Sequence, residues 1–223
     1  MELLEKDNIK LEEVDDYKIY PIADNDTPKL SADRLEYTFS NGLGVRDRIW
    51  TLEDIKEVYK NIEVQKNEDG ILELGFKDLK VAEKFVKNMS ILSKIYISNE
   101  VKFSMQFLAD VVKKMNERNL ITIEDLYTLS EREIIDKIER SDDKNLTKCF
   151  YIWKNAEYIK ESDNYIKDKY CLNIKAKTRY IVPLVRNENE FIRIDKLSKS
   201  AKEDIESILN YTPKKYAYLD FKL

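Results

Sequence analysis

Histidine is missing from all 223 residues of this sequence. A Ser-His-Asp or Cys-His catalytic group is therefore impossible within the chain, because both need an imidazole base. The only cysteines, Cys149 and Cys171, have neither the number nor the spacing of a zinc site or a disulfide framework. We expect both to be buried or half-buried thiols in a reducing compartment.

Glycine and proline are also scarce, with four of each. Flexible linkers and the Gly-rich phosphate loops of Walker or Rossmann type are therefore not expected. No apolar run approaches the roughly 18 residues of a membrane span, and the N-terminus has no signal pattern. These absences predict a soluble, cytoplasmic protein without a membrane partner. The preference for Lys, Asn, Ile and Tyr over Arg, His and Gly suggests a bacterial source.

Charge of either sign is plentiful but almost balanced, with 39 Lys and Arg against 43 Asp and Glu. The lysines alternate with acids along the chain, which is typical of solvated helix faces rather than of a basic stripe. We therefore do not expect a nucleic-acid partner. Most of the 14 tyrosines and both tryptophans are expected to pack between helices.

Hydrophobic spacing predicts a mainly α protein. Apolar residues recur at intervals of three and four in residues 79–97 and 99–118, which favours two long helices, and a further helix is expected at 146–160. Capping boxes mark the starts of three others, at Thr51–Asp54, Thr122–Asp125 and Ser130–Glu133. A short hairpin is expected near 62–76. We predict a helical bundle over residues 1–165 and a small α+β tail, of order β-β-α-β, over 166–223.

The segment Ile22–Gly42, IADNDTPKLSADRLEYTFSNG, has the composition of a binding site. Asp24 and Asp26 precede a proline on a predicted loop, and a helix is expected from Ser31 to Asn41-Gly42. Such acids suit Mg²⁺, Mn²⁺ or a borderline transition metal. Acidic side chains are equally common in turns and helix caps, so a purely structural role stays open.

On that helix the side chains divide into two stripes. Leu35 and Phe39 share an apolar face toward the core, whereas Asp33 and Tyr37 share a polar stripe that we expect to face inward, where a carboxylate could bind a metal. Arg34 points elsewhere and could pair with an acid or a phosphate. Asp33, near the helix start, could instead act only through the helix dipole.

Residues Tyr20–Asn41, with the core ADRLEY, resemble the segment that holds the last metal ligand in bacterial members of the HD-domain phosphohydrolase superfamily. The order of TLEDIKEVYKN, ELGFKD, AEKFVKN, TRYIVPLV and YAYLDF extends the resemblance over most of the chain. The family is helical around its site and binds a divalent metal through a His, a His-Asp pair and a later Asp. The resemblance implies that Asp33 is that later Asp. It also implies Asp24, Asp26, Arg34 and Tyr37 as candidates for contacts with substrate or with the metal ligands.

The sequence departs from the family pattern in one decisive respect. The His and the His-Asp pair should precede Asp33, yet the 32 preceding residues contain no histidine. The chain therefore resembles the C-terminal portion of an HD-type enzyme that hydrolyses a phosphate ester or nucleotide. We expect it to be inactive alone and to bind no metal by itself. Its partner would be an N-terminal HD half or a second copy. The alternative is a non-catalytic binding or regulatory protein on the same scaffold.

Overall fold

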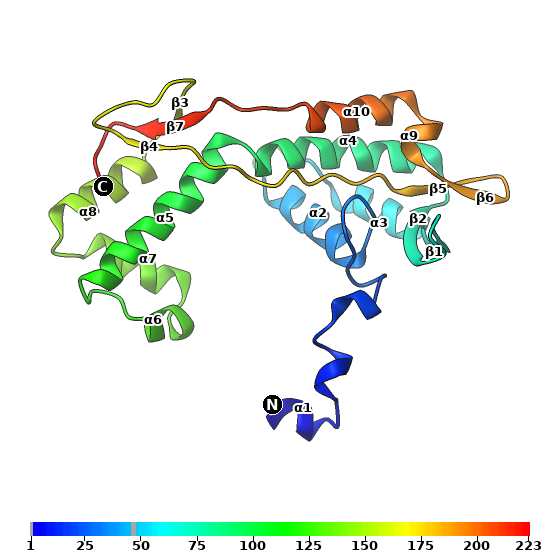
Figure 1. The fold of residues 1–223 in the computed structure, drawn as a ribbon, viewed down its shortest axis with the longest axis horizontal. Coiled ribbons are helices and arrows are strands. Elements are labelled where there is room, and N and C mark those ends of the chain that lie inside the picture. Colours follow the sequence, from blue (N-terminus) through cyan, green and yellow to red (C-terminus); the bar gives the residue numbers. More distant parts are fainter. Residues whose placement is uncertain (1, 46–47) are drawn as a thin grey trace. The chain divides into compact units, whose positions relative to one another are not determined.

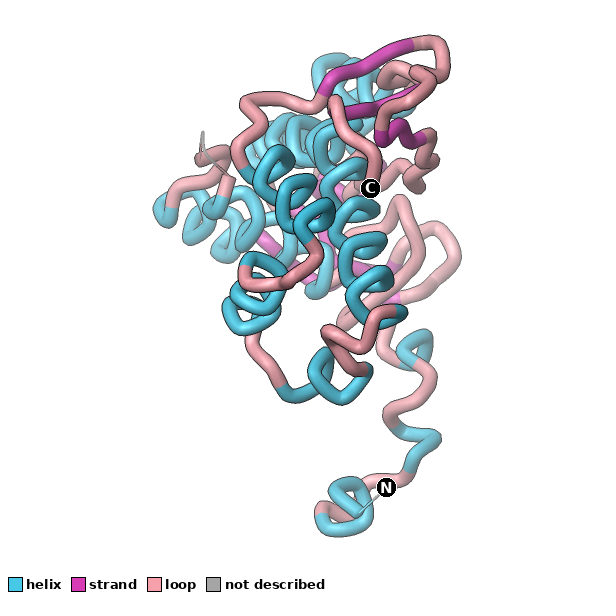
Figure 2. The backbone as a smooth tube through the Cα atoms, turned by 90° about the vertical axis from the view of Figure 1, so that its left-hand side faces the viewer, coloured by secondary structure: helices cyan, strands magenta, loops and turns pink. Residues whose placement is uncertain are grey.

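The computed structural model describes residues 2–45 and 48–223, and about half of them are helical (Figure 2). The prediction of a mainly α protein is confirmed. The chain divides into two compact units. The first contains the residues up to Lys94 together with Thr178–Tyr211, and the second contains Ile95–Lys177 together with Thr212–Leu223. Within the described residues, no helix combines the length and the apolar character that crossing a membrane requires.

The first unit combines helices with a four-stranded sheet. Its helices are α1 (Glu2–Lys6), α2 (Ala32–Gly44), α3 (Leu52–Asn61), α4 (Leu79–Tyr96), α9 (Ile194–Leu197) and α10 (Lys199–Leu209). Its strands are β1 (Ile62–Lys66), β2 (Leu72–Phe76), β5 (Leu184–Asn187) and β6 (Glu190–Arg193). Two 3-10 turns, Leu11–Glu13 and Tyr17–Ile19, lie between α1 and α2.

The sheet of the first unit has the order β1-β2-β5-β6 (Figure 1). The predicted hairpin is confirmed: β1 and β2 are antiparallel, with Ile62 opposite Phe76 and Lys66 opposite Leu72. Strand β5 then joins β2 in parallel, with Gly75 opposite Leu184. Strand β6 closes the far edge as the antiparallel partner of β5. Two segments that are distant in sequence therefore form one sheet.

Aromatic rings form the centre of the first unit. The centroids of Phe39 and Trp50 lie 5.0 Å apart with nearly perpendicular planes. Phe85 of α4 lies 5.9 Å from Trp50 and 5.2 Å from Phe76 of β2. Such edge and tilted contacts suit the ring quadrupole, and rings of this size dominate the energy of a small core. The cluster fixes α2 against α4 and the sheet.

The second unit contains four helices and a three-stranded sheet among its described residues. The helices are α5 (Asn99–Glu117), α6 (Ile123–Thr128), α7 (Glu131–Glu139) and α8 (Lys144–Lys154), and the strands are β3 (Lys160–Ser162), β4 (Tyr170–Leu172) and β7 (Tyr216–Leu219). The sheet order is β3-β7-β4. Phe103 and Phe107 of α5 pack on Tyr170 and on the C-terminal Phe221. As predicted, Cys149 is buried and Cys171 half-buried, and both are free thiols.

All three predicted capping boxes are confirmed. In each, the N-cap hydroxyl accepts from the N3 amide while the N3 carboxylate accepts from the N-cap amide. Hydrogen bonds from Thr122 lower the pKa of Asp125, and hydrogen bonds from Ser130 lower the pKa of Glu133. These local signals therefore predicted the first residue of α3, α6 and α7 correctly.

The structure differs from the prediction in the C-terminal part. The predicted tail at 166–223 is not a separate unit, because β5 and β6 pair with the first unit's hairpin whereas β4 and β7 pair with β3. The expected helix at 146–160 ends at Lys154, and Lys160–Ser162 is a strand. Backbone groups at a strand edge need partners. Which distant strand supplies them is not encoded in local spacing.

Candidate functional site

Helix α2 carries most of the predicted site residues, and it begins where the sequence predicts. The hydroxyl of Ser31 accepts from the Arg34 amide at 3.3 Å, and Ser31 is fully buried. Leu35 and Phe39 lie on the buried face, as expected. The helix continues past the predicted stop at Gly42 to Gly44. Gly42 therefore lies inside the helix, and a Cβ at this position would collide with the ring of Trp50.

Asp33 lies on the exposed side of α2, in its first turn. Its amide donates to the carbonyl of Ala23 at 3.0 Å, which attaches the helix start to the preceding loop. Its carboxylate forms no hydrogen bond or ion pair with any other described residue. Tyr37, one turn further on, is 57% exposed. The expectation that this polar stripe faces inward is therefore wrong: it faces solvent, because the buried side of α2 is occupied by Leu35 and Phe39.

Arg34 holds the loop that precedes α2. Its Nη1 donates to the carbonyl of Lys29 at 2.8 Å and to Oδ1 of Asn25, and its Nη2 donates to the carbonyl of Asn25. Asp24 lies 3.9 Å away and adds a weak ion pair. Asn25 in turn donates from Nδ2 to the carbonyls of Pro21 and Leu30, both at 3.0 Å. The loop is thus closed around one guanidinium.

The negative charges of this segment act on the guanidinium of Arg34. Burial lowers the pKa of Arg34, and the negative charges of Asp24, Asp26 and Asp33 oppose that shift. Of these three described acids, only Asp24 lies within ion-pair distance of the guanidinium, and Asp26 is exposed. The residue between them, Asn25, makes the closest contacts. Sequence reasoning missed Asn25 because an amide beside two acids gives no separate signal.

A buried acid behind the loop was also not predicted. Glu73 of β2 is fully buried and accepts from the Leu30 amide at 3.1 Å and from Nδ2 of Asn67 at 3.1 Å. Arg193 of β6 donates to the same carboxylate from Nη1 at 2.6 Å and from Nη2 at 2.8 Å. Burial opposes the charge of Arg193, but hydrogen bonds to Glu73 and Glu68 raise its pKa. The end of the loop is therefore anchored to the sheet.

The described residues contain no group of three or more His, Cys, Asp or Glu side chains placed to hold a metal ion. The three predicted acids do not meet at one point: Asp26 and Asp33 are exposed, whereas Asp24 is half-buried and pairs with Arg34. Comparison of the chain with models of protein families, with curated proteins and with solved structures finds no match.

Replacing Arg34 with lysine tests its structural role. We expect the free energy of unfolding to fall by about 1–2 kcal/mol, because an ammonium cannot reach Lys29 and both oxygens of Asn25 at once. Amide exchange in residues 22–30 should accelerate together with that loss. Arg179→Lys is the control, since Arg179 is exposed and should change stability by less than about 0.5 kcal/mol. Unchanged exchange in the loop of Arg34→Lys would contradict the role assigned to Arg34.

Proposed function

We propose that this chain is the C-terminal portion of an HD-type metal-dependent phosphohydrolase. In this proposal Asp33 is one ligand of a divalent metal, and the histidine ligands belong to residues outside this sequence. The observation that carries the proposal is the state of the Asp33 carboxylate. It is exposed on a helix start that Ser31 and Arg34 hold in place, and it forms no hydrogen bond or close ion pair with another described residue.

In this proposal the chain supplies only part of the metal site, in keeping with the described residues, which hold no group of three or more acids or cysteines placed around one ion. Holding a divalent ion and lowering the pKa of its bound water require several ligands, and Asp33 supplies one. We therefore expect no hydrolysis by this chain alone. In the complete protein, the reaction would be hydrolysis of a phosphate ester or of a nucleotide. Asp26 and Tyr37, which are exposed near Asp33 in sequence, are candidates for contacts with that substrate, whereas Asp24 and Arg34 stabilise the loop.

The decisive experiment starts from the DNA upstream of the Met1 codon. We expect an in-frame stretch that encodes a His and then a His-Asp pair. The extended protein, assayed with Mn²⁺ on nucleotides and a generic phosphate ester, should hydrolyse at least one of them. Asp33→Asn should reduce that rate by at least ~100-fold, since the loss of groups that merely support a ligand already costs 10–100-fold.

Glu53→Gln is the matched control, because Glu53 is another exposed acid in the first turn of a helix, α3. Both substitutions remove a favourable charge from a helix start and should each lower stability by about 0.3–1 kcal/mol. Only Asp33→Asn should affect hydrolysis. Robust hydrolysis by the present chain alone, abolished by Asp33→Ala, would show that the chain is complete and would overturn the proposal.

A second candidate function is a non-catalytic binding or regulatory protein. The observation that favours it lies before α2, where five apolar residues close in sequence are between 38% and 52% exposed: Ile9, Leu11, Val14, Ile19 and Tyr20. Clustered exposed apolar side chains commonly mark a contact with a partner or with a second copy. A stop codon and ribosome site directly upstream of Met1 would support this candidate. A monomer by light scattering, unchanged by Leu11→Ser, would count against self-association.

A further inference from the structure

Helix α8 presents a second candidate site, in the second unit and independent of Asp33. Its buried face contributes Leu146, Cys149 and Phe150 to the core. Its opposite face carries polar and aromatic side chains at intervals of three and four, which places them in one row: Lys144, Thr147, Lys148, Tyr151, Lys154 and Asn155.

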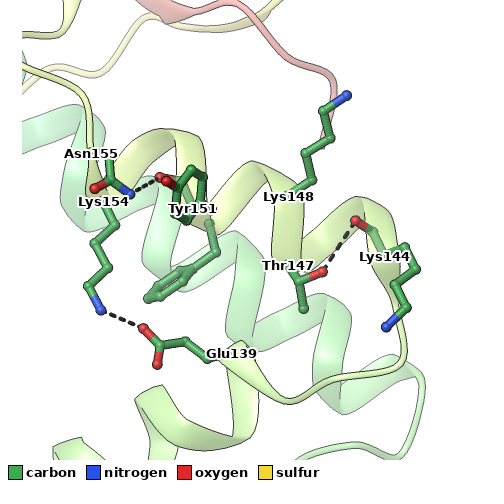
Figure 3. Close-up of a pocket in the computed structure, with 8 residues that line it drawn as sticks. Glu139, Lys144, Thr147, Lys148, Tyr151, Lys154 and Asn155 are labelled. Carbon is green, nitrogen blue, oxygen red and sulfur yellow. Dashed lines mark hydrogen bonds and ion pairs between the residues drawn. The ribbon is translucent and has the colours of Figure 1, made fainter.

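This row borders a hollow of about 540 Å³. Glu139, at the end of α7, lies on its other side (Figure 3). Lys154 reaches across to Glu139, and their charged atoms are 2.5 Å apart. The volume lies within the range of small-molecule sites, roughly 300–1,000 Å³. The hollow is therefore large enough to hold a ligand of nucleotide size.

Two cations at this hollow are unpaired. Lys144 and Lys148 are exposed, lie one turn apart on α8, and form no ion pair with any described residue. Long lysine side chains can turn toward a common anion. The backbone amides at the start of α8 are not available, because Asp143 accepts from the amides of Asn145 and Leu146, both at 3.1 Å. The two ammonium groups are thus the donors for an anion here.

The middle of the row offers a ring and an acceptor. Tyr151 is 68% exposed, which leaves its ring available for stacking. Asn155 donates from Nδ2 to the Tyr151 carbonyl at 2.8 Å, so its Oδ1 remains free to accept a hydrogen bond. Figure 3 shows Asn155 beside Tyr151 and away from Lys144. The hollow is therefore bordered by two cations, whose ammonium groups point in different directions in Figure 3, by an aromatic ring and by an amide acceptor.

We propose that this face of α8 binds a nucleotide. Lys144 and Lys148 hold the phosphate, the ring of Tyr151 stacks on the base, and Oδ1 of Asn155 accepts from an exocyclic amine. Stacking of a base on an aromatic side chain is typical of proteins that bind nucleotides and single strands. A small ligand fits better than a nucleic acid, because lysines alternate with acids along the chain and do not form an extended basic stripe.

The first test is titration of the protein with AMP, GMP, CMP, UMP and inorganic phosphate at low ionic strength, by calorimetry and by NMR shifts of the α8 amides. We expect at least one nucleotide to bind more tightly than phosphate and to shift those amides. Lys144→Glu with Lys148→Glu should weaken binding at least tenfold. The control pair Lys175→Glu with Lys177→Glu makes the same change of charge at exposed positions outside the hollow, and should stay within twofold.

The second test separates the ring from the charges. Tyr151→Ala should weaken nucleotide binding at least fivefold and leave phosphate binding unchanged, whereas Tyr151→Phe should retain nucleotide binding. If the control pair Lys175→Glu with Lys177→Glu weakens nucleotide binding as much as Lys144→Glu with Lys148→Glu does, the proposal is overturned, since binding would then depend on net charge alone. It would also be overturned by affinity that rises with oligonucleotide length, or by no binding of any nucleotide at millimolar concentration. Asp33→Asn should leave this binding unchanged, which separates it from the proposed hydrolase site.

Discussion

Arg193→Met is expected to lower the free energy of unfolding of the first unit by about 3–5 kcal/mol, because it leaves a buried carboxylate without its counter-charge. Glu73 is fully buried, and Arg193 supplies two of its four hydrogen bonds. The remaining two come from the Leu30 amide and from Asn67. Neutral donors cannot replace the guanidinium charge in a dry interior. The loop before α2 should also become more mobile, because the Leu30 amide at the end of this loop donates to the Glu73 carboxylate.

The measurement is urea unfolding followed by the fluorescence of Trp50, in a Trp153→Phe background so that only the first unit is reported. Arg186→Met is the control, because Arg186 pairs with Glu63 on the same sheet but is 48% exposed. We expect that control to cost less than about 1 kcal/mol. Adding Glu73→Met to Arg193→Met should recover part of the loss, because the stranded charge is removed. A double variant less stable than Arg193→Met would contradict this account.

Gly42→Ala is expected to lower the stability of the first unit by about 2–3 kcal/mol. An added Cβ would overlap Cδ1 of Trp50 and would lie only 3.1 Å from its Nε1 and 3.3 Å from Cδ1 of Leu92. Trp50 is fully buried between Phe39 and Phe85, so the indole has no room to retreat. The same unfolding experiment, supported by a shift in Trp50 emission, measures the effect.

Gly44→Ala provides the opposite result on the same helix. Gly44 is exposed, has an ordinary helical backbone, and an added Cβ would meet nothing within 4 Å. Alanine restricts the unfolded chain more than glycine does, so stability should rise by about 0.4–1 kcal/mol. Equal effects of the two substitutions would show that helix propensity, rather than the space beside Trp50, determines the role of Gly42.

Much of the candidate site could be predicted from local sequence. The start of α2 and the separation of its apolar stripe, Leu35 and Phe39, from its polar stripe, Asp33 and Tyr37, follow from helical periodicity and from Ser31 as the cap. That the polar stripe faces solvent did not follow from periodicity, because spacing does not say which stripe the rest of the fold covers. The partners of Arg34 could not be predicted in detail. Its contacts depend on how residues 21–30 fold back, and those contacts are mainly backbone carbonyls that carry no side-chain signal.

The sequence by itself determined the elements whose causes are local. The three capping boxes, the hairpin at 62–76 and the long helices α4 and α5 needed only hydrogen bonds within one turn or the spacing of apolar side chains. Tertiary structure alone decided where the C-terminal strands pair, and it placed Glu73 against Arg193, 120 residues away. The physical reason is that strand edges and buried charges are satisfied by whichever partners the folded chain brings near, and chain spacing does not specify those partners.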